Sequence, residues 1–366
     1  MVHCNVAVTG LNAMEDSLPG IPVIRSLRAA GEELTGKIIG LTYDTFDTGI
    51  YNSELLDEVY LMPYPSEGET AILQRLKEIV KKTPIQVLIP TVDAELVSYS
   101  RLEPELNELG IKVLLPPEDR IRLHQKQQLG AFCYYNGIKA PRTITITDPA
   151  ELSAAAKQVG FPFVLKGTLH DAYMVSSLPE ALVFYHKIKE AWGLPMVVQE
   201  YIKGEEYTVV ALADGSERLV GAVAIKKLRV TGTGKCWAGG TVHNEELLAL
   251  ARGIIEKLRW VGPLELEFIK RPDSPGYYLF EFNPRFPVTV YLVTRSGHNF
   301  PLALVRLLMG EKVEKLNGYQ AGVVSTRHTV DVIAPMEYIE SLATKGELIF
   351  DWKRKKEFKK ELISYE

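Results

Sequence analysis

The segment LFEFNPRFP, residues 279–287, begins as an apolar run and then carries polar side chains at every second position. Because alternate side chains of a strand share a face, Glu281, Asn283 and Arg285 are expected on one face together with Leu279. The opposite face is expected to hold aromatic side chains, namely Tyr278, Phe280 and Phe282. The sequence therefore predicts a carboxylate, an amide and a guanidinium that project together from one strand.

The preceding segment PLELEF, residues 263–268, repeats this alternation with Glu265 and Glu267. If the turn is centred between residues 273 and 274, Glu267 lies opposite Glu281, to within one residue of register. Carboxylates that face each other across a ladder destabilise it unless a cation neutralises them. Carboxylate and amide oxygens are ligands that Mg²⁺ prefers, with phosphate oxygens completing its octahedron. The alternative is a hairpin that shows its polar face to water.

Two lysines are candidates for binding phosphate. Lys166 ends the apolar segment FPFVLK, and Lys126 lies in a predicted helix ahead of GIKAP. A magnesium nucleotide needs such cations for the phosphate oxygens that the metal leaves uncompensated. Each lysine taken alone is also compatible with an ordinary solvated side chain.

The segment VVQEYIKGEEYTV, residues 197–209, is an apolar strand that breaks at Gly204 and resumes. The free N–H and C=O groups of such a break can pair with a purine, and the carboxylate of Glu206 can bind vicinal hydroxyls. The alternative, an acidic surface turn, is the interpretation we adopt for Glu205.

Cations also cluster around a glycine-rich turn in residues 224–244, AIKKLRVTGTGKCWAGGTVHN. Beside a metal site, Lys227 and Lys235 could hold an acyl phosphate or a substrate carboxylate. Solvated charges on a hairpin are the alternative for both.

The elements that must position these side chains follow from the hydrophobic periodicity. The first third of the chain alternates β-branched runs with segments of helical period, which predicts a parallel sheet with crossover helices. One helix is predicted over residues 118–137, ending at Gly137. Two antiparallel hairpins are predicted beyond residue 196, one around DGSER and one around RPDSPG. Helices beside antiparallel strands indicate an α+β unit that follows the α/β first third.

Composition excludes several classes of protein. The chain has 366 residues, of which 46% are hydrophobic and 24% charged, and a net charge of -4. This predicts a globular protein of two or three domains, with no electrostatic reason to bind nucleic acid or a membrane. Three scattered cysteines form neither a metal-spaced pair nor a disulfide framework. With no signal-peptide pattern at the N-terminus, we expect a reduced, cytoplasmic protein.

In their order and spacing, these motifs resemble the ATP-grasp superfamily, particularly the carboxylate-amine ligases and the synthetase domains of carbamoyl phosphate synthetase and biotin carboxylase. The resemblance runs from residue 1 to about residue 310. It implies an N-terminal α/β domain (1–117), an ATP-grasp domain of two parts (118–200 and 201–310) and a C-terminal extension (311–366).

The resemblance also implies the roles of the site residues. Lys126 and Lys166 would hold the nucleotide's phosphates. The adenine-binding hinge would be formed by Glu200, Tyr201 and Ile202, with Glu206 on the ribose. Mg²⁺, or Mn²⁺ in its place, would be bound by Glu267, Glu281 and Asn283. Arg285 would face the transferring phosphoryl group or the acceptor carboxylate.

Two departures from the family pattern matter. The loop GTLHDAYMVSS, residues 167–177, has fewer small residues than is usual over the phosphates, so His170 or Asp171 is a further candidate contact. After Arg285 the sequence FPVTV lacks the Gln and Glu with which biotin carboxylases handle bicarbonate and biotin, which argues against biotin carboxylation. The basic end of the chain, residues 351–366, is interpreted as a solvated helix rather than a nucleic-acid module.

The resemblance implies an ATP-dependent carboxylate-amine, or carboxylate-thiol, ligase that forms an acyl phosphate and releases ADP and phosphate. Its partners would be small-molecule or peptide carboxylates and amines, and a homodimer is left open. Two alternatives remain at this point: an ATP-binding regulatory or scaffold protein without ligase activity, and a small-molecule kinase.

Overall fold

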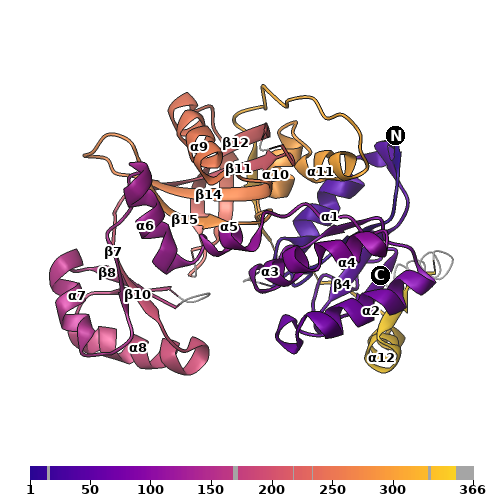
Figure 1. Ribbon diagram of the computed structural model, residues 1–366, viewed down its shortest axis with the longest axis horizontal. Coiled ribbons are helices and arrows are strands. Elements are labelled where there is room, and N and C mark those ends of the chain that lie inside the picture. The colour runs from indigo at the N-terminus through magenta and orange to yellow at the C-terminus, as the bar shows by residue number, and fades with distance from the viewer. Residues whose placement is uncertain (15–16, 168–171, 217, 233, 329–330, 352–366) are drawn as a thin grey trace, which may run out of the picture.

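The computed structural model describes residues 1–14, 17–167, 172–216, 218–232, 234–328 and 331–351. Three multi-stranded sheets organise these residues, each with its own helices (Figure 1). A two-stranded ribbon, β1 (Val2–His3) with β3 (Leu34–Thr35), adds to the N-terminal part. The predicted mixture of a parallel N-terminal sheet and later antiparallel sheets is confirmed.

The N-terminal sheet has the order β17-β5-β4-β2-β6. Its four parallel strands are β2 (Val6–Val8), β4 (Ile38–Thr42), β5 (Glu58–Leu61) and β6 (Val87–Ile89). They are almost wholly buried, as expected for a parallel sheet covered on both faces. The connected elements are α1 (Gly20–Arg28), η1 (Gly31–Glu33), η2 (Pro65–Glu67), α2 (Glu69–Lys82), α3 (Asp93–Arg101) and α4 (Glu103–Glu108).

The connections that leave β2 and β6 run to opposite sides of this sheet, which makes a topological switch point between the two strands. Open α/β sheets bind ligands outside the carboxyl ends of the strands at such a point. Here the loops that follow β2 and β6 face the large antiparallel sheet, so they are placed to contact a ligand bound on that sheet.

The small sheet has the order β7-β10-β8-β9 and is entirely antiparallel. Its strands are β7 (Thr143–Ile146), β8 (Phe163–Lys166), β9 (Ala172–Val175) and β10 (Met196–Glu200). Two helices, α7 (Glu151–Val159) and α8 (Leu178–Trp192), cover it, and together they enclose a hydrophobic core of their own. It lies at the lower left of Figure 1.

The large sheet has the order β15-β14-β11-β12-β13-β16, with antiparallel neighbours throughout. Its strands are β11 (Glu205–Ala213), β12 (Leu219–Val230), β13 (Cys236–Thr241), β14 (Gly262–Lys270), β15 (Tyr277–Asn283) and β16 (Val324–Thr326). Helix α9 (Glu245–Leu258) packs on one face through leucines and isoleucines. Both predicted hairpins are present, as β11–β12 and β14–β15.

One hydrophobic core joins the large sheet to the N-terminal sheet. It contains β2 and β6 residues, α1, the apolar side chains of β11 and β12 that face away from α9, and the helices α10 (Val290–Arg295) and α11 (Phe300–Leu308). Because this core is continuous, the large sheet and the N-terminal loops are held in a fixed arrangement.

The prediction of a single helix over residues 118–137 is wrong in one respect. The structure has two helices, α5 (Glu118–Arg122) and α6 (Lys126–Asn136), and the second ends at Gly137 in the left-handed conformation, φ 66°, as predicted. Between them the chain tightens into i→i+3 hydrogen bonds, and Gln125 adopts an extended ψ of 128°. The break starts a new helix at Lys126, whose side chain therefore lies in a first turn.

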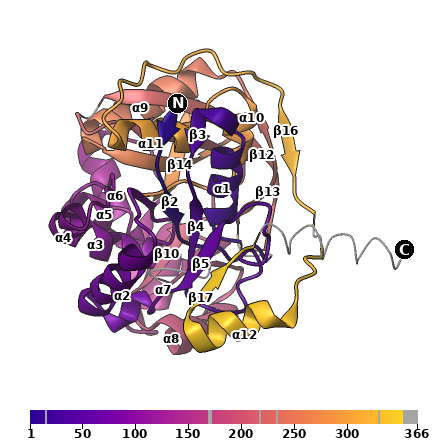
Figure 2. The ribbon, with the colours of Figure 1, turned by 90° about the vertical axis from the view of Figure 1, so that its right-hand side faces the viewer.

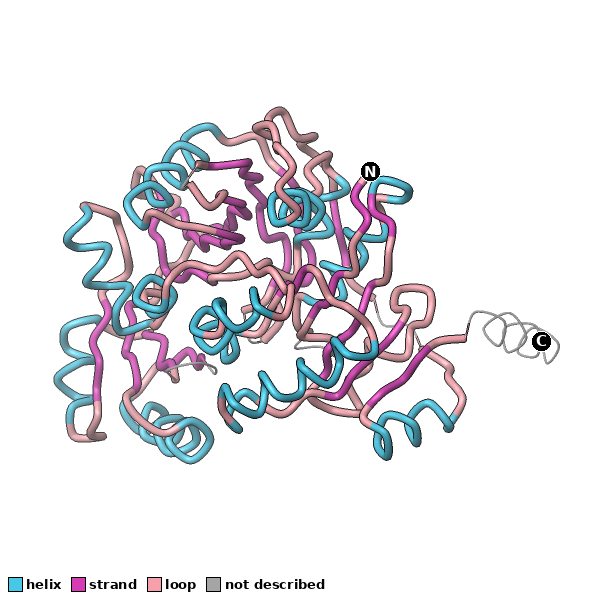
Figure 3. Tube along the Cα trace, turned by 45° about the vertical axis from the view of Figure 1, so that its right-hand side comes forward, coloured by secondary structure: helices cyan, strands magenta, loops and turns pink. Residues whose placement is uncertain are grey.

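The C-terminal region contributes to two sheets. Strand β16 is the edge of the large sheet, whereas α12 (Met336–Lys345) and β17 (Glu347–Ile349) add to the N-terminal sheet beside β5 (Figure 2). Figure 3 shows this C-terminal strand next to the N-terminal strands. The terminal helix predicted for residues 351–366 lies almost wholly outside the described residues, and the division into 1–117, 118–310 and 311–366 stays a prediction.

Candidate active site

The carboxylates of the β14–β15 hairpin lie within one residue of the predicted register. Glu267 is the direct cross-strand partner of Glu281, and Glu265 is the partner of Asn283. The Asn283 amide donates to Glu265 (2.9 Å) and to Glu267 (3.2 Å). Glu265 is buried and also accepts a hydrogen bond from Thr208 (3.0 Å). The hairpin therefore holds three carboxylates rather than two, of which Glu265 and Glu267 accept from the amide, and the alternation along β14 was the available signal for Glu265.

The predicted alternation along β15 is wrong at Leu279 and Phe280, which exchange faces. A register shift follows Glu267, so that Leu279, not Phe280, pairs with Phe268. Such a β-bulge places two successive residues on one side of the strand. Leu279 consequently packs in the core under α9, and the Phe280 ring instead lies 5.4 Å from the Lys166 ammonium and 5.7 Å from that of Lys227. Phe280 is thus an aromatic surface between two cations of the site, which sequence reasoning missed.

Lys227, on β12, is held among the carboxylates. Its buried ammonium contacts Glu267, lies 3.4 Å from Glu206 and donates to the carbonyl of Gly234 (3.3 Å). Burial alone would lower the pKa of Lys227, but Glu267, Glu206 and Glu265 outweigh it and hold that pKa above its ordinary value. Lys227 therefore stays charged and neutralises the carboxylate cluster.

Lys166, at the end of β8, faces the cluster from the small sheet. It is 5% exposed, and its ammonium lies 3.8 Å from Glu281. Burial lowers the pKa of Lys166, and the field of Lys126 adds to this while Glu281 opposes it. Lys126 lies close by, because it donates to the carbonyl of Gly167 (3.4 Å), the residue after Lys166. The two predicted phosphate lysines are thus brought together at the end of one strand.

The two facing carboxylates differ electrostatically. Burial would raise the pKa of Glu281, but Lys126, Lys166 and Lys227 outweigh it and lower that pKa. For Glu267, burial together with Glu265 and Glu281 raises the pKa, and Lys227 opposes the rise without cancelling it. Positive charge at this point of the hairpin is therefore favourable, since it relieves repulsion between neighbouring carboxylates.

Arg285 links this cluster to the N-terminal sheet. Its guanidinium donates to Asp93 through two nitrogens (3.0 and 3.2 Å) and lies 3.9 Å from Glu265. Burial would lower the pKa of Arg285, but Asp93 and Glu265 raise it. Asp93 begins α3 directly after β6, so it stands at the topological switch point. Sequence reasoning did not single out Asp93.

Arg327 is a second arginine at the same boundary, and sequence reasoning missed it. It follows β16 and donates to the hydroxyl of Ser17 (2.5 Å), in the loop after β2. Burial lowers the pKa of Arg327, while Cys236 and Glu265 oppose this. The site thus has one guanidinium directed at each of the two loops that flank the switch point.

The predicted adenine hinge joins the small sheet to the large one. Glu200 ends β10, Ile202 is buried and Tyr201 is 39% exposed. The Glu200 carboxylate is engaged by Arg271 (2.6 Å) and by the amide of Arg142 (3.2 Å), and its own N–H donates to the carbonyl of Arg142 (2.8 Å). Glu205 pairs with Lys226 (2.5 Å) on the surface, as the surface interpretation predicts.

Lys235 lies on the turn between β12 and β13, next to Gly234, whose carbonyl accepts from Lys227. The turn therefore places it near the cluster, and its role stays a prediction. His170 and Asp171 lie outside the described residues.

The donor set fits Mg²⁺ shared with a nucleotide. Among the described residues, no group of three or more His, Cys, Asp or Glu side chains could hold a metal ion by itself. Glu267, Glu281 and Asn283 supply two carboxylates and an amide. The amide nitrogen of Asn283 faces the carboxylates, so the amide would have to flip for its oxygen to bind the metal. Mg²⁺ commonly takes one or two carboxylates and completes its shell with phosphate oxygens and water, so a nucleotide would have to bind with it.

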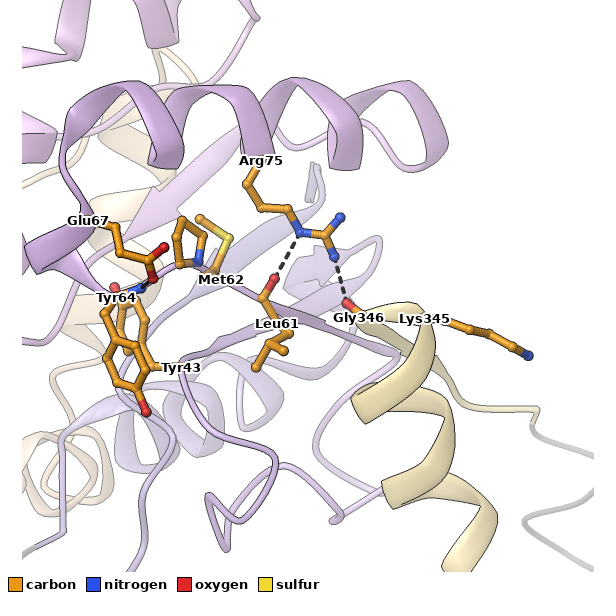
Figure 4. Close-up of a pocket in the computed structure, with 9 residues that line it drawn as sticks. Tyr43, Leu61, Met62, Tyr64, Glu67, Arg75, Lys345 and Gly346 are labelled. Atoms are coloured by element: carbon orange, nitrogen blue, oxygen red, sulfur yellow. Dashed lines mark hydrogen bonds between the residues drawn. The ribbon is translucent and has the colours of Figure 1, made fainter.

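A cavity elsewhere does not coincide with these residues. It has a volume of about 390 Å³ and lies between α2 and the end of α12 (Figure 4). Two cations line it, Arg75 and Lys345, and Arg75 is engaged by the carbonyls of Leu61 (2.9 Å) and Gly346 (2.6 Å). We assign the active site from the convergence of lysines and carboxylates instead, because this cavity has no comparable charge pairing.

Comparison with known proteins confirms the predicted resemblance. A family described as "ATP-grasp in the biosynthetic pathway with Ter operon" matches residues 194–330, which hold the large sheet. The carbamoyl phosphate synthase large chain of Agathobacter rectalis is 22% identical over 311 residues, or 79% of this chain. The chain spans only 27% of the length of that relative.

Solved structures share the fold. An L-amino acid ligase from Bacillus licheniformis has 17% identity and a TM-score of 0.63, over 83% of this chain and 74% of that one. The biotin carboxylase domain dimer of 2-oxoglutarate carboxylase from Hydrogenobacter thermophilus, in complex with MgADP, ADP and bicarbonate, has 16% identity and a TM-score of 0.64, over 86% and 71%. Biotin carboxylase from Campylobacter jejuni, in a nucleotide complex, has 15% identity and a TM-score of 0.65, over 86% and 74%.

At these identities the likeness establishes the ATP-grasp fold. In the part of the chain that the structure describes, no helix is long and apolar enough to cross a membrane.

Proposed function

We propose that this protein, which has the ATP-grasp fold, is an ATP-dependent ligase that joins a carboxylate to an amine, or to a thiol, and releases ADP and phosphate. The observation that carries the proposal is the pairing of Lys166 with Glu281 and of Lys227 with Glu267 at one point between two sheets. The fold shared with an L-amino acid ligase and with nucleotide-bound carboxylases supports it.

Lys126 and Lys166 would bind the phosphates of ATP. The base would contact the main chain of Glu200, Tyr201 and Ile202, and the ribose would lie against Glu206. When bound at Glu267, Glu281 and Asn283, Mg²⁺, or Mn²⁺ in its place, would supply neutralisation of the charge that develops on the phosphate oxygens. Lys227 and Lys235 would then stabilise the transferring group or the substrate carboxylate.

The acceptor carboxylate would lie between the large sheet and the N-terminal loops, where Arg285 and Arg327 are found. One of its oxygens attacks the γ-phosphorus, and the bond from that phosphorus to the bridging oxygen of ADP breaks. The amine nitrogen then attacks the acyl carbon, phosphate leaves with the former carboxylate oxygen, and the amine gives up one proton. The buried side chains of Lys166 and Lys227 and the half-buried side chain of Arg285 would keep water from the acyl phosphate.

The same site could serve a kinase, or a regulatory protein that binds ATP without ligating anything. A screen of small-molecule and peptide acids, with and without amines, for ADP release identifies the substrate. An ¹⁸O-labelled carboxylate should then leave one label in the released phosphate, and hydroxylamine should trap a hydroxamate before amine is added. ADP without label in phosphate would sink the ligase proposal, and AMP with pyrophosphate would rule out γ-phosphoryl transfer.

We also propose a homodimer in the cytoplasm. The dimer named for the biotin carboxylase domain supports the former, and the three buried free cysteines are consistent with the latter.

A further inference from the structure

The guanidinium of Arg327 is a half-buried charge without a carboxylate partner. Lys166, Lys227 and Arg285 each form an ion pair with a carboxylate. Arg327 forms no ion pair within the ranges that the structure describes, and its guanidinium donates to the hydroxyl of Ser17 (2.5 Å). Withdrawing a charge from water is costly when no counter-charge faces it. The remaining N–H donors of this guanidinium are therefore available to an anion from outside the chain.

The strand register places Arg327 on the same face of the large sheet as Lys227. Lys227 is the cross-strand partner of Gly239, and Gly239 is the partner of Ser325. Cross-strand partners share a face, and Arg327 lies two residues beyond Ser325, so it shares this face too. The amide of Arg327 donates to the carbonyl of Trp237 (3.2 Å), which continues the pairing to this residue. Arg327 therefore projects from the face that carries the candidate active site.

Arg327 lies away from the position expected for the phosphates of ATP. Lys166 contacts Glu281 on β15, whereas Arg327 follows β16, at the opposite edge of the sheet (Figure 2). Strand β13 lies between β12 and β16, so the backbones of Lys227 and Arg327 are about 10 Å apart at the usual strand spacing. Lys227 contacts Glu267 of the β14–β15 hairpin. An anion on Arg327 would thus be a different group from a carboxylate that reaches the γ-phosphorus beside that hairpin.

We propose that the acid substrate carries a second anionic group, several bonds from the carboxylate that reacts, and that Arg327 binds this group. This assignment rests on the proposed ligase function and deepens it by naming the class of acid. Arg285 is a weaker candidate, because Asp93 already accepts from two of its nitrogens. Ser17 would assist, since its hydroxyl hydrogen has no acceptor among the described residues. The second group is an oxyanion, either a carboxylate or a phosphate, because a guanidinium pairs with both.

Calorimetric titration in the presence of Mg-ADP tests this assignment without turnover. The probes are succinate, glutarate and adipate, their monoamides, and the corresponding acids in which a phosphonate replaces one carboxylate. At one chain length or more, a doubly charged probe should bind at least about tenfold more tightly than its monoamide, as expected for charge-assisted hydrogen bonds. Tighter binding of the phosphonate would identify a phosphate as the second group, and tighter binding of the dicarboxylate a carboxylate.

Replacement of Arg327 should remove this preference. Arg327→Met should weaken the doubly charged probe at least about tenfold and leave its monoamide unchanged, whereas a structural role alone would weaken both alike. Arg327→Lys keeps the charge but loses the planar fork, so a smaller preference should remain. Arg252→Met is the matched control, since it removes an exposed arginine of α9 and should bind every probe as the wild type does. If Arg327→Met does not fold, the wild-type preference and Arg327→Lys still decide.

The proposal is overturned if every doubly charged probe binds the wild type no more tightly than its monoamide, or if Arg327→Met keeps the preference. It also fails, with the ligase function intact, if the acid that the ADP-release screen identifies has only one anionic group. Conversely, a preference that depends on Arg327 in a protein that forms no hydroxamate with any acid would refute the ligase function and keep the anion site. The two failures are therefore distinguishable.

Discussion

Replacement of Glu281 by Gln gives the most direct test of the candidate active site. The charges around Glu281 predict that the variant binds metal-free ATP more tightly but Mg-ATP more weakly than the wild type does. Glu281 lies 3.8 Å from Lys166, and its pKa is lowered by Lys126, Lys166 and Lys227 in spite of burial. At an effective dielectric constant of about 20, one pair of charges at this distance attracts by about 4 kcal/mol. Glu281 is 30% exposed on its side chain, so water screens part of this.

Without nucleotide, Glu281→Gln leaves three ammonium groups with one fewer counter-charge. We expect the free energy of unfolding to fall by about 2 kcal/mol, roughly half of the unscreened pair energy. Metal-free ATP, a polyanion, should bind about tenfold more tightly to the variant. Mg-ATP should bind about tenfold more weakly, because one metal ligand is lost, and turnover should fall by about 100-fold.

Calorimetric titration with ATP, in EDTA and in Mg²⁺, measures both affinities on the same protein. The ratio of the two dissociation constants should change by about 100-fold between wild type and variant, which is about 2.7 kcal/mol. Glu205→Gln is the matched control, since it removes an exposed carboxylate that pairs with Lys226 and should leave the ratio unchanged. An unchanged ratio in Glu281→Gln would refute the assignment of Glu281 to a metal beside phosphate.

Three further predictions concern single side chains. Lys166→Met should weaken ATP binding by about 10- to 100-fold with or without Mg²⁺ in titration calorimetry, as expected for a lost charge-assisted bond, while Lys226→Met should not. Arg285→Lys should depress turnover by at least about tenfold with a near-normal melting temperature, because lysine keeps the charge beside Asp93 but loses the planar fork; wild-type turnover would contradict this. Burial raises the pKa of Glu95 from 4.5 to about 7, so its stabilising contribution is present below about pH 4.5 and is lost as the pH rises through 7. Between pH 4.5 and pH 8, the free energy of unfolding should therefore fall by up to about 3 kcal/mol less in Glu95→Gln than in the wild type, as measured by denaturant unfolding. If Glu95→Gln loses as much stability over this range as the exposed control Glu103→Gln, the prediction is contradicted.

The parts of the site that lie on neighbouring strands could be predicted from sequence. A period of two and a short turn were enough to place Glu267 within one residue of Glu281, and the bulge makes the two direct partners. The bulge at Phe280 could not be predicted, because Leu279 and Phe280 are both apolar and the pattern does not say which one is extra. Glu265 was visible in the same alternation, but the resemblance assigned it no role.

Contacts between distant segments had no local signal. Arg285 and Asp93 are 192 residues apart, and Arg327 and Ser17 are 310 residues apart. Each pair depends on how α1 packs against α10 and α11 in the shared core, which no local pattern encodes. The break between α5 and α6 was missed for a related reason, since residues 123–125 carry no glycine or proline that would mark it.

The division of the site between two hydrophobic cores explains why its facing surfaces are charged. The carboxylates, Arg285 and Arg327 belong to the large sheet, which shares a core with the N-terminal sheet, whereas Lys166 belongs to the small sheet with a separate core. Across the boundary, Lys166 and Glu281 lie 3.8 Å apart, beyond the usual length of a hydrogen bond. If apolar side chains met there, separating the sheets would expose them to water at about 25 cal/mol for each Å². Charged side chains are instead hydrated when the sheets separate. A nucleotide can therefore replace the contact between Lys166 and Glu281 without exposing either hydrophobic core to water.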